Sequence, residues 1–427
     1  MSKKVSDKMS NMAQRYGIVI YILVIWFAIS FVTNLIGPLM PVLIQDFKLS
    51  LGMAGFLPFS FFLAYGLVSI PGGILVERRG ARFTLMLAFA LNLIGALAIA
   101  VQPVFAVVIG GLFVIGLGMA LLQVVINPLM RTAGGEANFA FFSVMGQLVF
   151  GLASFISPWV FQWMMTRSVT APGGLVWVDF YWAFVAAFVA LLLLNQRLPL
   201  PTVDLKDDER MGGMKAYREL LSRIDVWLYF LAIVAYVGTE QTLANWMSQF
   251  LSSQHGLSAT AEGADAVGQF WGLMSLGCLL GLLLLKLMDS RRVLMLFVLG
   301  AMACVAAALY GSAATALWAF PAAGFCLSVM FSVLFSLALN SVPMHHGAFS
   351  GILCTGILGG AVLPMLVGQL GEAIGLRLAM SSVFISLAYI LSVAFWARPL
   401  VANKTVRLTE LLSSRRRPAA SPAQNPP

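Results

Sequence analysis

One acidic residue, Glu240, lies deep inside a long apolar stretch, and in this 427-residue sequence it is the side chain best placed to bind and release a proton. It lies about fifteen residues beyond Asp225, among small or apolar neighbours such as Gly238 and Leu243. The other sixteen of the seventeen acidic residues lie in polar segments or near the ends of apolar ones. An apolar environment favours the neutral form of a carboxyl group, so we expect Glu240 to exchange a proton. The alternative is a permanently neutral glutamic acid that hydrogen-bonds between packed helices.

Uncharged polar side chains inside other apolar stretches are candidates for binding a neutral, hydroxyl-rich molecule such as a sugar. Gln123 and Asn127 are four residues apart and therefore share one face of a helix. An amide both donates and accepts hydrogen bonds, as a sugar hydroxyl does, and aromatic rings can cover the apolar face of a sugar. The remaining candidates are Asn34, Gln147, Asn245, Trp246, Gln269, Trp271 and Asn340. For each amide the alternative is a hydrogen bond between helices, worth about 0.6 kcal/mol, and we expect Trp26 and Trp182 to occupy core or interfacial positions.

Metal, cofactor and enzyme chemistry leave no signature in the sequence. The cysteines (Cys278, Cys304, Cys326 and Cys354) and the histidines (His255, His345 and His346) show no metal-ligand spacing. No G-x-x-x-x-G-K-[ST] loop is present for binding ATP, and no nucleophile–base pair occurs in a polar segment. We therefore expect no metal, no cofactor and no enzymatic activity.

The composition is that of a helical membrane protein. Apolar residues make up 60% of the chain and charged residues 10%, against roughly 25% charged residues in soluble domains, and the mean hydropathy is +0.92. These values exclude a soluble globular protein, a nucleic-acid-binding protein and a secreted disulfide scaffold. One bilayer crossing takes roughly 20 apolar residues, which leaves room for about twelve crossings. We expect a monomeric protein that is embedded in the lipid bilayer and binds no nucleic acid.

Apolar runs separated by short polar breaks predict an all-α protein with twelve transmembrane helices. They cover residues 17–44, 51–76, 83–101, 104–130, 137–165 and 176–196, and then 226–252, 264–289, 292–312, 315–342, 347–371 and 375–398. The domains are an N-terminal arm (1–16), a first six-helix bundle (17–196), a central loop (197–224), a second bundle (225–398) and a disordered tail (399–427). Asn34 is followed by Gly37, Pro38 and Pro41, so we expect the first helix to break near its middle.

The distribution of basic residues predicts the orientation. With these twelve helices, 23 of the 26 Lys and Arg residues fall on one side, together with both ends of the chain and the central loop. Only Lys48, Arg167 and Arg377 remain for the other side. Because basic residues concentrate in cytoplasmic loops, we expect the N-terminal arm, the central loop and the tail to be cytoplasmic.

The segment between the second and third predicted helices carries a short motif. Residues 73–82 read GILVERRGAR, which resembles the G-x-x-x-D-R-x-G-R-R loop of the major facilitator superfamily. The matching residues are Gly73, Glu77 in place of Asp, Arg78, Gly80 and Arg82. The resemblance implies two pseudo-symmetric six-helix halves with a substrate midway between them, and a gating loop whose acid and arginines latch the halves together. The alternative is that these basic residues only anchor the loop to lipid.

Four longer stretches are similar to one branch of that superfamily, the fucose and glucose/galactose permeases. They are GLGMALLQVVINPLM (116–130), AYVGTEQTLANW (235–246), FCLSVMFSVLFSLALN (325–340) and SGILCTGILGGAVLP (350–364). The resemblance implies a multi-pass sugar importer of the bacterial inner membrane, driven by a cation gradient, usually of protons, with Na⁺ as the alternative cation.

Three positions distinguish this sequence from the fucose permeases. Gly37 stands where they have an Asp, Gln123 where they have a Glu, and Glu240 where they have a Gln. The last two resemble the glucose/galactose branch. We therefore expect Glu240 to be the proton-coupling residue and Gln123 to contact the sugar.

Two other functions fit the same architecture. One is proton-coupled export of drugs or metabolites, for which GQLVFGLASFISP (146–158) is a loose match to a Gly/Pro-rich exporter motif. The other is a membrane sensor that transports nothing, although no signalling domain is apparent in the sequence.

Overall fold

The computed structural model describes residues 2–134, 139–167, 175–200, 214–343 and 345–400, and within these ranges the chain is almost entirely helical. The first half contains α1 (Ser2–Asn34), α2 (Ile36–Phe47), α3 (Leu51–Ala54), α4 (Phe56–Val101), α5 (Phe105–Gly134), α6 (Phe139–Arg167) and α7 (Val178–Arg197). The second contains α8 (Met214–Leu221), α9 (Ile224–His255), η2 (Ala259–Gly263), α10 (Ala264–Leu287), α11 (Ser290–Tyr310), α12 (Ala313–Leu327), α13 (Met330–Leu339), α14 (His346–Thr355), η3 (Gly356–Leu358), α15 (Gly359–Ile374), α16 (Leu376–Met380) and α17 (Val383–Trp396). The predicted tail falls almost wholly outside the described residues.

The number of membrane crossings agrees with the prediction. Eleven helical stretches of the described chain are long and apolar enough to cross a bilayer. The second, Leu51–Val101, has 51 residues, more than twice the roughly 20 that one crossing takes. Gly80 interrupts it with φ 79° and ψ 168°, a backbone conformation that is essentially restricted to glycine. The chain therefore crosses twice within this stretch, and the twelve-helix prediction is confirmed.

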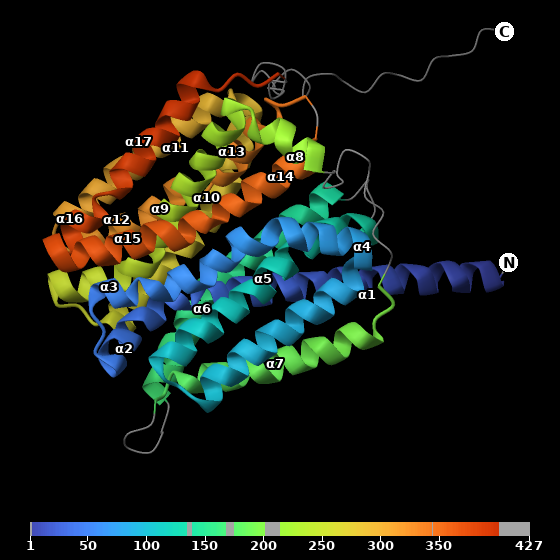
Figure 1. Ribbon diagram of the computed structural model, residues 1–427, viewed down its shortest axis with the longest axis horizontal. Helices are drawn as coiled ribbons and strands as arrows, with labels where there is room; N and C mark the ends of the chain where they lie inside the picture. The colour runs from blue at the N-terminus through green and yellow to red at the C-terminus, as the bar shows by residue number, and fades with distance from the viewer. Residues whose placement is uncertain (1, 135–138, 168–174, 201–213, 344, 401–427) are drawn as a thin grey trace, which may run out of the picture.

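The two halves lie side by side (Figure 1). Contacts between them run along α6 and α10, α4 and α15, and α2 and α9. In Figure 1, α8 and the start of α1 lie at the right, whereas α3 and α16 lie at the left. We call the first end the termini face and the second the far face.

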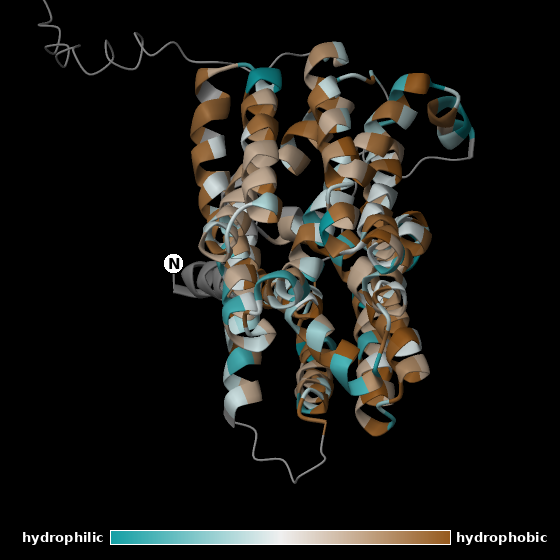
Figure 2. Cartoon of the chain, turned by 90° about the vertical axis from the view of Figure 1, so that its left-hand side faces the viewer, coloured by the Kyte–Doolittle hydropathy of each residue, from teal (hydrophilic) through white to brown (hydrophobic). Residues whose placement is uncertain are grey.

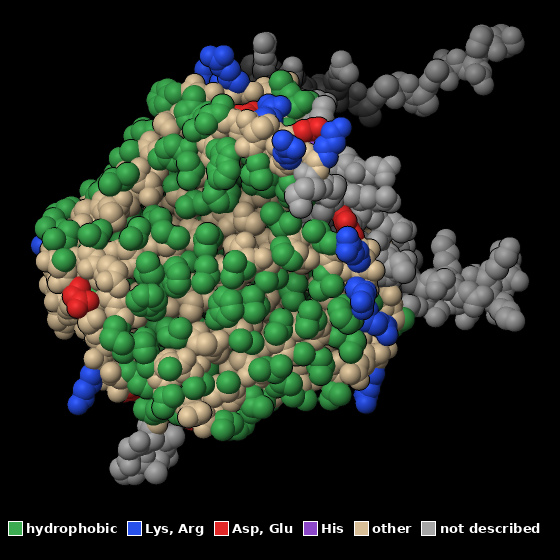
Figure 3. Space-filling view, viewed as in Figure 1, with side chains coloured by type: hydrophobic (Ala, Val, Ile, Leu, Met, Phe, Trp, Pro, Cys, Tyr) green, Lys and Arg blue, Asp and Glu red, His purple; other side chains and the backbone are tan. Residues whose placement is uncertain are grey.

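The surface has the polarity of a membrane protein. Hydrophobic residues predominate along the helices (Figure 2), and hydrophobic side chains cover the middle of the surface shown in Figure 3. Large side chains such as Ile385, Phe395 and Trp318 are more than two-thirds exposed, as lipid-facing residues should be. On the face in Figure 3, most Lys and Arg side chains gather towards the termini face.

Several crossing helices are interrupted near the middle. The first crossing breaks at Leu35, between α1 and α2, because Pro38 has no N–H to donate to the carbonyl of Asn34. This is the break that the sequence predicts. The tenth crossing divides between Leu327 and Met330 without a proline at the break, although it was expected to be continuous. The central loop also contains an unpredicted short helix, α8.

One contact recurs at corresponding places in the two halves. Arg82, after the Gly80 turn, donates a hydrogen bond to the carbonyl of Leu198, just beyond the sixth crossing. Arg291, after the equivalent turn of the second half, donates to the carbonyl of Ala397, just beyond the twelfth crossing, at 3.4 Å. The same arginine-to-carbonyl contact in both halves supports the predicted pseudo-symmetry.

Candidate functional site

A cavity of about 370 Å³ lies between the two halves. Residues of α1, α4, α5 and α6 line it from the first half, and residues of α9, α10 and the tenth and eleventh crossings line it from the second. Its volume falls within the range of about 300–1,000 Å³ that is typical of small-molecule sites. A site at the junction of the halves is where the superfamily resemblance implies a substrate.

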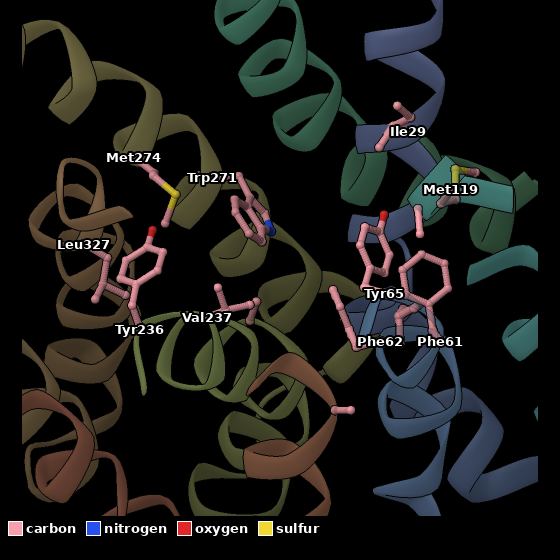
Figure 4. Packing of buried hydrophobic residues seen from close by; sticks show 14 of the residues in the cluster. Ile29, Phe61, Phe62, Tyr65, Met119, Tyr236, Val237, Trp271, Met274 and Leu327 are labelled. Carbon is pink, nitrogen blue, oxygen red and sulfur yellow. The ribbon is translucent and has the colours of Figure 1, made fainter. Parts of the chain in front are cut away.

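Aromatic side chains form much of the cavity wall. Phe62 and Tyr65 come from α4, whereas Tyr236 and Trp271 come from α9 and α10. Figure 4 shows these two groups on opposite sides of the space between the halves. Trp26 of α1 also lines the cavity, although the sequence favoured a packing role for it. Such rings offer flat apolar surfaces to the ring of a sugar.

The cavity extends towards the termini face. Its lining continues along α10 from Trp271 to Leu285, a distance of about 21 Å at 1.5 Å per helical residue. On α1 it extends towards the N-terminus as far as Trp26. This lining reaches far towards one membrane surface, so we interpret the structure as the state that opens at the termini face.

Contacts between the halves close the far face. The backbone N–H of Gly52 donates to Oε2 of Glu372 at 3.1 Å, and Nε2 of Gln369 donates to the carbonyl of Gly52 at 3.1 Å. On the other flank, Nε1 of Trp159 donates to Oδ1 of Asp265 at 3.1 Å. Each of these hydrogen bonds joins the first half to the second, so all must break if the far face is to open.

The first and seventh crossings, one from each half, approach closely beside Gly37. A Cβ atom at this position would lie 2.5 Å from the carbonyl oxygen of Ala244 in α9, well inside normal van der Waals contact. An Asp at position 37, which the resemblance to the fucose permeases would imply, therefore has no room in this structure. The first and seventh crossings can approach this closely because position 37 carries no side chain.

Glu240 lies on the cavity wall, with hydrogen-bond donors at both carboxyl oxygens. The hydroxyl of Tyr236 donates to Oε1 at 2.7 Å, and Nε2 of Gln241 lies 3.5 Å from Oε2. No basic side chain of the described residues forms an ion pair with it. A charged carboxylate without a cation is costly at this depth, at about 2.5–3.5 kcal/mol or more. A carboxyl group in these surroundings can hold a proton or compensate the charge of a bound cation.

Three of the predicted sugar-binding residues line the cavity: Gln123, Asn34 and Trp271. Asn34 and Trp271 are each 4% exposed, and both carry a polar atom that lacks a hydrogen-bond partner in the described part of the chain: Oδ1 of Asn34 and Nε1 of Trp271. Oγ of Ser328, also on the cavity wall, is in the same situation. Buried polar atoms are rarely left unpaired, so these three atoms of the cavity wall are candidates for contact with a polar ligand.

The other predicted residues are placed elsewhere or lie outside the description. The side chains of Asn127 and Gln147 are not among those described. Asn245 donates to the carbonyl of Gln241 at 2.7 Å, and Trp246 donates to the carbonyl of Pro364 at 2.9 Å. Gln269 donates to Asp265 at 2.6 Å, and Asn340 to Ser336 at 3.3 Å. None of these last four residues lines the cavity in this conformation.

Sequence reasoning missed Tyr236 and Gln241. Both line the cavity and contact Glu240. Tyr236 lies one helical turn before Glu240, and Gln241 follows it directly. The i, i+4 neighbours of a buried carboxyl group are the first residues to examine for its hydrogen-bond donors, and this spacing alone would have identified the tyrosine.

The predicted gating loop is held within its own half at Arg82. This arginine donates to the carbonyl of Leu198, its own carbonyl accepts from Asn195 at 3.4 Å, and Asn195 accepts from the hydroxyl of Tyr21 at 3.0 Å. Glu77 faces α8 of the connector: burial, and then the negative charge of Glu77, raise the pKa of Tyr217 to about 12. The gating role of Gly73, Glu77, Arg78, Gly80 and Arg82 remains a prediction.

Known proteins match almost the whole chain. A family model described as Major Facilitator Superfamily matches residues 22–363. The glucose/galactose transporter of Brucella abortus (strain 9-941) is 30% identical over 381 residues, which cover 86% of this chain and 90% of that protein. The L-fucose-proton symporter of Escherichia coli K12 is 22% identical over 400 residues, which cover 88% of this chain and 91% of that protein.

A solved structure shows the same fold. The chain superimposes with a TM-score of 0.71 and 17% identity on a bacterial homologue of the human lysosomal transporter Spinster, determined in an inward-facing conformation. The superposition covers 90% of this chain and 97% of the other.

Proposed function

The chain belongs to the major facilitator superfamily, and from this we propose that it imports a neutral monosaccharide, such as glucose or galactose, together with a proton. The superfamily consists of membrane transporters, so the prediction that the protein is not an enzyme is confirmed. The names of the similar sugar transporters support the proposed substrate class. The resemblance to the glucose/galactose branch at Gln123 and Glu240 favours a hexose.

The polarity of the cavity is the observation that carries the proposal. Glu240 is the one charged side chain among the described residues of its wall, and the remaining polar groups are amides, hydroxyls, a thiol and indoles. A sugar phosphate would find no counter-ion in this lining, whereas an uncharged polyol can pair with the unpartnered atoms of Asn34, Trp271 and Ser328. The lining therefore selects for neutral, hydroxyl-rich molecules.

The proposed substrate class can be tested by fluorescence. Trp26 and Trp271 line the cavity, so the intrinsic tryptophan emission of the purified protein should change when D-glucose or D-galactose binds. Glucose 6-phosphate should cause no saturable change. A response to the phosphate ester and none to either hexose would contradict the proposal.

Alternating access follows from the contacts between the halves. In this state the far face is closed by Gly52, Glu372, Trp159 and Asp265, and the cavity reaches towards the termini face. Breaking those contacts while the termini face closes would expose the same cavity to the other side.

Gln123 should contribute directly to the affinity for sugar. In Gln123→Ala a sugar hydroxyl loses its partner, at a cost of about 1–3 kcal/mol, so the sugar concentration at half-maximal uptake should rise roughly ten- to hundredfold. Gln123→Glu should be milder, because the carboxylate keeps an acceptor. The measurement is the concentration dependence of uptake, and an unchanged value in Gln123→Ala would remove this residue from the site.

The termini face is proposed to be the cytoplasmic side of a bacterial inner membrane. Support comes from the basic side chains that gather there (Figure 3) and from the excess of basic residues in the loops assigned to that side. A reporter enzyme that is active only in the periplasm, fused after Arg415, should be inactive. Full activity of this fusion would reverse the orientation, and a fusion in the turn after Lys48 provides the positive control.

A further inference from the structure

The amide of Asn34 is held by a chain of hydrogen bonds between α1 and α6. Its Nδ2 donates to Oγ of Ser154 at 2.9 Å and to the carbonyl of Ser30 at 3.0 Å. The hydroxyls of Ser30 and Ser154 both lie within hydrogen-bond distance of the carbonyl of Phe150, at 2.6 and 2.9 Å. Asn34 is 4% exposed and both serines are 0% exposed, so no bulk water competes for these groups.

The direction of each hydrogen bond follows from the one before it. A carbonyl oxygen can accept two hydrogen bonds, and inside α6 the oxygen of Phe150 already accepts the backbone N–H of Ser154. It therefore takes one serine proton, and the other serine donates across the 2.6 Å between the two hydroxyl oxygens. Both serine hydrogens are then engaged, so the serine oxygens accept hydrogen bonds from the NH₂ group of Asn34. The reverse amide orientation would set Oδ1 against the carbonyl oxygen of Ser30, with two acceptors facing each other. Oδ1 is therefore the one atom of this amide that is left without a hydrogen-bond partner in the described part of the chain.

We propose that Ser30 and Ser154 are positioning residues that fix the amide of Asn34, so that only its carbonyl oxygen faces the substrate and this position requires a hydroxyl that donates. The inference rests on the proposed function, because it assigns one polarity to one contact of the proposed sugar site. Trp271 provides the opposite case: its unpartnered Nε1–H can only donate. The two halves therefore present groups of opposite polarity to the sugar, an acceptor from α1 and a donor from α10.

Fluorinated sugars test the polarity at Asn34. Fluorine has nearly the size of a hydroxyl and accepts weakly, but it cannot donate. The full-length protein in proteoliposomes should exchange labelled D-glucose or D-galactose, and the deoxyfluoro analogues of that hexose, fluorinated at one position at a time, should compete. At the position facing Asn34, the fluoro analogue should bind about ten- to a hundredfold more weakly than the parent sugar. Asn34→Ala should remove this difference.

The serines are tested in the double variant Ser30→Ala/Ser154→Ala. There only the backbone carbonyl of residue 30 still holds the Nδ2 group, so the amide turns its NH₂ group towards the cavity for part of the time, and the difference in affinity between fluoro and parent sugar should shrink severalfold. A purely structural role of the serines would weaken the binding of both sugars equally and leave the ratio of their affinities unchanged. Ser157→Ala is the matched control, because Ser157 joins the same two helices through the carbonyl of Phe31 at 2.9 Å. Its ratio should equal that of the wild type.

Two results would overturn the inference, and they differ. If the wild type exchanges a hexose but the ratio is unchanged in both Ser154→Ala and the double variant, the positioning role fails while the proposed function stands. If the wild type exchanges neither glucose nor galactose, the proposed function fails and the inference fails with it.

Discussion

Glu240→Gln should abolish the accumulation of sugar against its gradient while leaving sugar exchange across the membrane intact. Glutamine keeps the shape of the protonated side chain and an oxygen that can accept from Tyr236, which now donates to Glu240 at 2.7 Å. What it loses is the capacity to take up and release a proton. Exchange of internal for external sugar moves no net proton, so it needs no titrating group. Net transport against the sugar gradient does need a titrating group, and no other carboxyl group of the described residues lines the cavity.

The two readouts are measured in the same proteoliposomes. Counterflow of labelled hexose should continue in Glu240→Gln at a rate close to that of the wild type, whereas uptake driven by a pH gradient should stop and the pH dependence of uptake should disappear. Glu262→Gln is the control, since this carboxyl group accepts from the backbone of Ser258 outside the cavity. Accumulation by Glu240→Gln that depends on Na⁺ would move coupling to another cation and site, and accumulation driven by protons would make the carboxyl group structural.

Gly37→Val should slow transport strongly by hindering closure of the far face. The added side chain would begin 2.5 Å from the carbonyl oxygen of Ala244. Forcing extra atoms into a packed contact costs about 1–3 kcal/mol, and this cost falls only on the state in which α2 and α9 touch. The equilibrium should shift roughly ten- to hundredfold towards the state that opens at the far face, and uptake should fall accordingly.

Cys278 provides the readout for this shift, because it lines the cavity. In a background where Cys304, Cys326 and Cys354 are replaced by Ala, a membrane-impermeant thiol reagent applied from the far face should modify Cys278 faster in Gly37→Val. Gly17→Val is the matched control on α1, because a Cβ at Gly17 meets nothing within 4 Å. Equal labelling and equal uptake in the two variants would show that the contact at Gly37 does not control opening.

The overall architecture was predictable because the physics of the bilayer acts on long stretches of sequence. Twenty-residue apolar runs and the placement of Arg and Lys are averages over many residues, and single exceptions do not disturb them. The sequence also singled out Glu240, because a single charged residue inside an apolar run is costly in a bilayer. The break after Asn34 was predictable from Pro38, whereas the break in the tenth crossing has no proline to indicate it.

The lining of the cavity was less predictable, because the same residue types serve packing and binding. Asn245 and Trp246 satisfy their polar groups on Gln241 and Pro364, whereas Asn34 and Trp271 leave a polar atom unpaired. Nothing in the identity of an amide or an indole separates these cases. The difference depends on which helix face meets the other half of the molecule, and that is set by tertiary packing.

Accumulation of labelled D-glucose or D-galactose in cells that express the protein, with and without a protonophore, tests the central claim most directly. The account predicts that at least one of these hexoses accumulates above its external concentration and that the protonophore abolishes the accumulation. Cells that fail to concentrate either sugar, or whose internal sugar rises when the protonophore is added, as expected of a proton-coupled exporter, would contradict it.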